Sequence, residues 1–118
     1  MKKLIEKIET YIKNPSKGLP EDIFYLVSRL TPYINVDLLV KNDIGQTLLS
    51  WRDETSLDNS TGCGWHIPGG VIRFQEEISN RIREVALHEM GAKLSYHSEQ
   101  PLTVNQVMDY KAKNRSHF

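Results

Sequence analysis

Residues 65–91 read WHIPGGVIRFQEEISNRIREVALHEMG, and the second half of this stretch has the pattern of an amphipathic helix. Because an α-helix turns about 100° per residue, Ile78, Ile82 and Val85 share one face. Glu89 falls on the same face, about 20° from Ile78 around the helix axis. A carboxylate on an apolar stripe needs a cation, a metal ion or hydrogen-bond donors in place of the water it loses. The pattern therefore predicts a helix from about residue 76 to residue 90 that brings Glu89 to a compensating partner.

The residues that flank this helix predict its ends. Glu76 is an acid at the expected N-terminus, where the helix dipole favours negative charge, and Gly91 is the expected C-terminal stop. Pro68, Gly69 and Gly70 predict a sharp backbone turn that can approach a ligand closely. Four other polar residues of the helix are expected together on the solvent side, namely Glu77, Arg81, Glu84 and His88.

The rest of the chain predicts a mixture of helices and hairpins. Apolar residues recur at helical spacing in residues 1–14 and 20–30, and the second segment opens with Pro20 and two acids. Residues 33–42 and 46–52 read as two strands joined by a hairpin turn, and residues 53–64 as a polar loop. Further strands are expected at WHIP, at 93–99 and at 103–112. This order indicates an α/β (α+β) fold and lacks the regular alternation of a doubly wound sheet.

Composition limits the class of protein. The 118 residues suit one domain, and 15 basic residues balance 15 acidic ones. The zero net charge gives no electrostatic reason to expect nucleic acid or an anionic membrane as a partner. A lone cysteine, Cys63, fits a reducing compartment and reads as an inert loop thiol. The chain has no apolar run of about 18 residues, so we expect a cytoplasmic protein without a membrane partner.

Four residues of the stretch fall at the spacing of a known motif. Gly70, Glu76, Glu89 and Gly91 stand where the Nudix box places its glycine, glutamate, glutamate and glycine. The segment from about Tyr33 to Met108 resembles the Nudix hydrolase family. The resemblance implies a Nudix-type α/β/α sandwich with a mixed sheet over residues 33–118. Residues 1–32 would then form an extension of two added N-terminal helices.

The departures from the box indicate one branch of that family. Val85 stands where the box has a glutamate, as in the GDP-mannose mannosyl hydrolases, and His88 replaces a second glutamate. The resemblance to this branch implies one Mg²⁺ (or Mn²⁺) held by the Gly69 carbonyl and the Glu89 carboxylate. The general base of that branch lies beyond the position of Phe118, so we expect either a truncated chain or an altered site.

The same resemblance implies a substrate and the residues that bind it. Asp37 and Arg52 correspond to substrate-binding residues, with Gly70, Glu76 and Gly91 supporting the box. The implied partner is a nucleoside-diphosphate small molecule such as GDP-mannose, and a homodimer is left open. Two alternatives are a nucleotide-binding Nudix-like module without catalysis and an ADP-ribose-type pyrophosphatase.

Each of these residues also has a purely structural interpretation. Glu89 could pair with a neighbouring arginine or lysine, and Glu76 could be an ordinary first-turn acid. Asp37 interrupts the apolar strand INVDLLV, where a structural hydrogen bond and a substrate contact fit equally well. Arg52 suits a phosphate because its guanidinium matches paired oxygens, yet arginines are common on surfaces. Gly69 and Gly70 could form a turn with no ligand.

Overall fold

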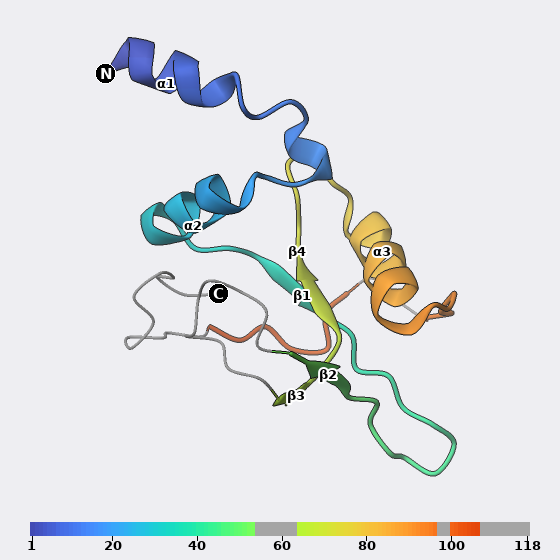
Figure 1. The fold of residues 1–118 in the computed structure, drawn as a ribbon. Coiled ribbons are helices and arrows are strands. Elements are labelled where there is room, and N and C mark those ends of the chain that lie inside the picture. The colour runs from blue at the N-terminus through green and yellow to red at the C-terminus, as the bar shows by residue number, and fades with distance from the viewer. Residues whose placement is uncertain (54–63, 97–99, 107–118) are drawn as a thin grey trace.

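The computed structural model describes residues 1–53, 64–96 and 100–106. Over these residues the chain is a small α+β protein with two separate two-stranded antiparallel sheets (Figure 1). The helices are α1 (Lys2–Glu9), the 3-10 helix η1 (Pro15–Lys17), α2 (Glu21–Leu30) and α3 (Ile78–Met90). The strands are β1 (Asn35–Asp37), β2 (Ser50–Arg52), β3 (Gly64–His66) and β4 (Gly69–Val71).

The core lies where α3 packs against the first sheet. β1 pairs with β4, with Val36 opposite Gly70 and Asp37 opposite Gly69. α3 lies beside this pair (Figure 1) and buries Ile82, Val85 and Ala86 together with Leu38. The predicted amphipathic helix is therefore confirmed, because Ile82 and Val85 of its apolar stripe meet the sheet, although Ile78 at its first turn is 43% exposed. Gly91 ends α3 in the left-handed conformation, as its position predicted.

The second sheet extends from a hairpin. Lys41 bridges Thr47, and the turn between them contains Gly45 at φ 83°. The Asn42 side-chain oxygen accepts hydrogen bonds from the backbone amides of Ile44 and Gln46, which closes the turn. The predicted hairpin is thereby confirmed, although its regular pairing is shorter than the sequence indicated. β2 continues from it and pairs with β3, and Ser50 lies opposite His66.

The two N-terminal helices form where the sequence places them. α2 follows Pro20 and has two acids in its first turn, while its end at Leu30 precedes Pro32. α1 has no buried residue and lies at one end of the molecule in Figure 1, away from both sheets. Tertiary packing therefore contributes little to α1, whose apolar residues Leu4 and Ile5 remain about half exposed.

Several expectations about the fold are corrected. The predicted Nudix-type sandwich with a mixed sheet is not formed by the described residues, whose two sheets are separate and entirely antiparallel. Gly69 and Gly70 lie in strand β4 and do not form the predicted sharp turn. Residues 93–96 and 103–106, the described parts of two predicted strands, form no strand. Cys63 and most of the predicted polar loop lie outside the described residues.

Over the part of the chain that the structure describes, no helix has the length and apolarity needed to cross a membrane.

Candidate functional site

Glu89 finds its partners on the second sheet. The Ser50 hydroxyl donates a hydrogen bond of 2.7 Å to Glu89 Oε2, and His66 Nε2 lies 3.4 Å from the same oxygen. The Glu89 side chain is 26% exposed, so it is neither free in water nor fully buried. The charge that the sequence places on an apolar stripe is therefore met by a hydroxyl and an imidazole, and by no arginine or lysine among the described residues.

Strand alternation places these partners on one face. Successive side chains of a strand point to opposite sides, so Ser50 and Arg52 share a side of β2 and Trp51 lies on the other. His66 faces Ser50 in register and joins the same side, while Trp65 pairs with Trp51 behind it. The second sheet thus has a polar face toward α3 and an aromatic face away from it.

Asp37 completes this polar face from the first sheet. Partial burial raises the pKa of its carboxyl group, whereas the hydrogen bond from Asn35 and the charges of Arg52 and His66 lower it. The charges of Arg52 and His66 therefore act on Asp37 across the two sheets. We call Asp37, Ser50, Arg52, His66 and Glu89 the polar cluster. Two of the residues predicted to bind substrate, Asp37 and Arg52, are thus brought together with the predicted metal ligand Glu89.

Gly69 gives the Asp37 carboxylate the space it occupies. A Cβ on Gly69 would collide with Asp37 Oδ1 and lie 3.0 Å from the backbone oxygen of Val36. Asn35 Nδ2 donates a 2.6 Å hydrogen bond to the same Asp37 oxygen and fixes its position. Glycine is therefore required at this position by the close approach of a carboxylate, even though its backbone conformation is that of an ordinary strand.

The tautomer of His66 follows from its surroundings. Its Nδ1 is buried and has no hydrogen-bond partner, which favours the hydrogen on Nε2, facing Ser50 Oγ at 3.3 Å and Glu89. The Ser50 hydroxyl donates its hydrogen bond to Glu89 and not to His66. Ser50 therefore lacks the serine–histidine arrangement of an activated nucleophile. This geometry allows Glu89 to accept a proton from a bound molecule while the His66 Nε2 hydrogen bonds to another of its oxygens.

Glu76 serves a structural network at the other end of α3. Arg81 Nε and Nη2 donate to its two oxygens at 2.8 and 2.7 Å, and Asn80 and the Arg73 amide add further donors. The Arg81 hydrogen bonds are the largest of the influences that lower the pKa of Glu76 to about 2. Arg81 was predicted to face solvent, and this is wrong: it is 6% exposed. The ion pair explains the difference, since it compensates a buried guanidinium.

Gly70 has a packing role. A Cβ at Gly70 would lie 3.1 Å from Val85 Cγ2, closer than most real Cβ contacts. This glycine therefore allows α3 to approach β4.

The described residues contain no group of three or more histidine, cysteine, aspartate or glutamate side chains arranged to hold a metal ion. A complete protein cage for Mg²⁺ or Mn²⁺ is therefore not present in that part of the chain, and metal binding by Gly69 and Glu89 stays a prediction. Ser50 was missed by sequence reasoning. Its signal was its strand position two residues before Arg52, which places both on one side.

Comparisons with curated proteins include a distant similarity. No known protein family matches the chain, and no solved structure does. The low-salt glycan biosynthesis protein Agl8 of Haloferax volcanii is 27% identical to it over 85 residues. The matched segment covers 71% of this chain and 51% of that protein, so the chain spans about half the length of Agl8.

These comparisons correct the family assignment. The spacing of Gly70, Glu76, Glu89 and Gly91 predicted a Nudix hydrolase, but no family match supports it, and the described strands form no Nudix sandwich. The predicted function, magnesium-dependent hydrolysis of a nucleotide sugar such as GDP-mannose, is overturned with it, as are its two Nudix-based alternatives. Agl8, to which the chain is distantly similar, is a glycan biosynthesis protein.

Proposed function

We propose that this chain acts in glycan biosynthesis and that its polar cluster binds a sugar phosphate precursor. One observation carries the proposal: Ser50 of β2 and His66 of β3 contact Glu89 of α3, and the charges of His66 and Arg52 act on Asp37 of β1. Sugar hydroxyls both donate and accept hydrogen bonds, which matches a set of carboxylates, a hydroxyl and an imidazole. Arg52 adds a guanidinium whose geometry suits paired phosphate oxygens.

The similarity to Agl8 supports the same process. That protein is described as acting in the biosynthesis of a glycan, and the matched segment covers 71% of this chain. Precursors of glycans carry sugars activated through phosphate, so a site that combines hydroxyl-binding carboxylates with an arginine fits this role.

The chemistry we propose at this face is proton transfer. Glu89 would accept a proton from a substrate hydroxyl, and the Nε2 hydrogen of His66 would hydrogen-bond to a second substrate oxygen and polarise it without leaving the ring. The two groups lie 3.4 Å apart, close enough to act on one small molecule. Asp37 and Arg52 would hold the substrate, the first through hydroxyl groups and the second through phosphate.

We propose that a divalent cation binds together with the substrate and takes one carboxylate ligand from the protein. Mg²⁺ commonly uses one or two carboxylates, keeps several waters and takes its other ligands from substrate phosphate. Glu89 could serve as such a carboxylate without a protein cage. The cation, when bound, would supply positive charge to the substrate phosphate.

Nuclear magnetic resonance tests the proposal directly. Hexose 1-phosphates and N-acetylhexosamine 1-phosphates would be titrated into ¹⁵N-labelled protein with Mg²⁺, beside the free sugars and inorganic phosphate. We expect saturable amide shifts at Ser50, Arg52 and His66. Turnover here means any chemical change of the phosphate ester, and ³¹P spectra would report it. Glu89→Gln should abolish turnover, while Glu84→Gln on the solvent side of the same helix should leave it unchanged.

The outcomes separate three interpretations. Shifts at the polar cluster together with turnover would support an enzyme. Shifts without turnover would support a sugar phosphate-binding protein without catalysis. Absence of saturable shifts with every sugar phosphate, or equal shifts with inorganic phosphate alone, would overturn it.

A further inference from the structure

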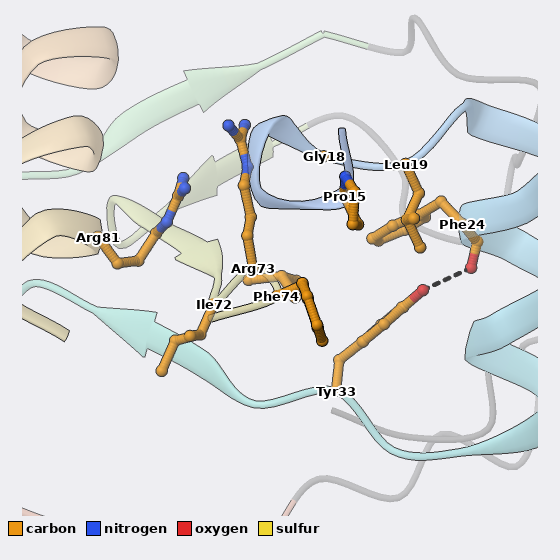
Figure 2. Close-up of a pocket in the computed structure, with 10 residues that line it drawn as sticks. Pro15, Gly18, Leu19, Phe24, Tyr33, Ile72, Arg73, Phe74 and Arg81 are labelled. Atoms are coloured by element: carbon orange, nitrogen blue, oxygen red, sulfur yellow. Dashed lines mark hydrogen bonds between the residues drawn. The ribbon is translucent and has the colours of Figure 1, made fainter. Parts of the chain in front are cut away.

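A second hollow of the molecule lies away from the polar cluster. It has a volume of about 310 Å³ and lies between η1, α2 and the segment that joins β4 to α3. Its lining includes Leu19, Phe24, Tyr33, Arg73 and Phe74 (Figure 2). We name it the aromatic cavity. Its size is at the lower end of the range of about 300–1,000 Å³ that is typical of small-molecule sites.

We infer that the aromatic cavity binds a small molecule with a planar ring and one anionic group. The inference is independent of the proposed glycan function, because no residue of the polar cluster lines this cavity.

Two stacked rings build one wall. The Phe24 and Tyr33 rings have centroids 4.7 Å apart and planes inclined by 18°. The Tyr33 hydroxyl donates a 2.7 Å hydrogen bond to the Phe24 carbonyl oxygen, drawn as a dashed line in Figure 2, and so holds its ring in place. A rigid aromatic surface favours flat ligands, because rings attract one another in offset or edge-on contact.

Phe74 gives the cavity an apolar surface that is open to water. Its side chain lies near Tyr33 in Figure 2, yet the residue is 59% exposed. Covering apolar surface is favourable by about 25 cal/mol per Å², so a ring inserted beside Phe74 would gain affinity from its burial.

Arg73 supplies the charge that selects an anion. Its guanidinium lies against Gly18, with Cζ and Nε 3.7 Å from the position of a Cβ there. Among the described residues no carboxylate pairs with Arg73, whereas the neighbouring Arg81 is already neutralised by Glu76. The cavity thus combines aromatic walls with one guanidinium that can bind a carboxylate or phosphate.

The test uses three probes that separate ring from charge. 2-Naphthoate carries both features, 2-naphthylmethanol carries the rings alone, and acetate carries the charge alone. Each would be titrated into ¹⁵N-labelled protein and followed by amide chemical shifts. We expect saturable shifts at Gly18, Phe24, Tyr33 and Phe74 with naphthoate, about tenfold weaker binding of naphthylmethanol, and no saturable shift with acetate.

Two variants at exposed positions sharpen the test. Arg73→Gln should weaken naphthoate binding about tenfold and remove its advantage over naphthylmethanol, and Phe74→Ala should weaken both aromatic probes. Arg29→Gln on α2, an exposed arginine that does not line the cavity, is the matched control and should bind as the parent does. The amide spectra of the free variants report that they remain folded.

Equal binding of naphthoate to the parent and to Arg73→Gln would overturn the inference. So would shifts confined to the Trp51 and Trp65 face of the second sheet, or the absence of any saturable shift.

Discussion

Ser50 and Glu89 are 39 positions apart in the chain, and the hydroxyl of the first donates a 2.7 Å hydrogen bond to the carboxylate of the second. This contact joins β2 of the second sheet to α3, which otherwise packs on the first sheet. A carboxylate near the core is thereby satisfied from within the chain, and the same contact brings together the groups of the polar cluster.

Removing the donor of this bond should destabilise the protein. Hydrogen bonds to charged groups contribute about 1.5–3 kcal/mol. Because Glu89 is partly exposed and water can replace the lost donor, Ser50→Ala should lower the free energy of unfolding by about 1–2 kcal/mol. Urea denaturation measures the change, with the exposed Ser95→Ala as control. A double variant with Glu89→Gln should cost less than the sum of the two single changes, and strict additivity would contradict the coupling.

The Glu76–Arg81 pair predicts a dependence of stability on pH. The pKa of Glu76 falls from 4.5 to about 2 on folding, so the folded state binds its proton more weakly than the unfolded state does. The stabilisation is fully present above pH 4.5 and is lost as the pH falls toward 2. Denaturation midpoints measured between pH 6 and pH 2 should show this loss.

Glu76→Gln isolates the ion pair itself. Both side chains are nearly buried, at 5% and 7% exposure, so the change leaves a guanidinium without its counter-charge. We expect a loss of about 3 kcal/mol in the free energy of unfolding at neutral pH, and a reduced slope between pH 4.5 and 2. Glu6→Gln on the exposed helix α1 is the control, and an unchanged acid slope in Glu76→Gln would contradict the assignment.

Gly69 and Asp37 should be coupled through sterics. Gly69→Ala places a methyl group against the Asp37 carboxylate and the Val36 carbonyl, and we expect a cost of about 1–3 kcal/mol. Asp37→Ala removes the closest of the three neighbouring atoms, so Gly69→Ala should cost less in that background. Thermal denaturation of the four proteins measures the coupling, and an equal cost in both backgrounds would refute the contact.

Magnesium binding, if Glu89 is its carboxylate ligand, should depend on substrate. Because the described residues offer no three-ligand cluster, we expect weak binding of Mg²⁺ alone and tighter binding with a sugar phosphate. Calorimetric titration of the parent, Glu89→Gln and Glu84→Gln measures this difference. Tight binding of Mg²⁺ alone would contradict the dependence on substrate, and identical titrations for the parent and Glu89→Gln would exclude Glu89 as the ligand.

Local pattern predicted much of the secondary structure. Helical spacing gave all three α-helices, and the glycine at position 91 gave the end of α3. The hairpin around Gly45 followed from turn chemistry. The predicted position of Glu89 in the apolar stripe also agrees with the structure, because side-chain direction on a helix depends only on its 3.6-residue period.

The match to the Nudix box predicted the wrong family, because it rested on the spacing of four residues alone. Gly70, Glu76, Glu89 and Gly91 match a box in sequence, but the structure gives them different tasks. Gly70 admits Val85, Glu76 holds Arg81, and Gly91 caps α3, while only Glu89 joins the polar cluster. Spacing describes the positions of residues along the chain, and it does not determine which distant segments contact them.

The sequence by itself determined the helices, the hairpin and the face on which Glu89 lies, since these follow from short-range periodicity and turn chemistry. Only the tertiary structure decided that Ser50 and His66 meet Glu89, that Glu76 neutralises a buried Arg81, and that the aromatic cavity forms beside Arg73. The physical reason is that such contacts depend on how α3 and the two sheets pack, which balances burial against charge compensation across distant segments.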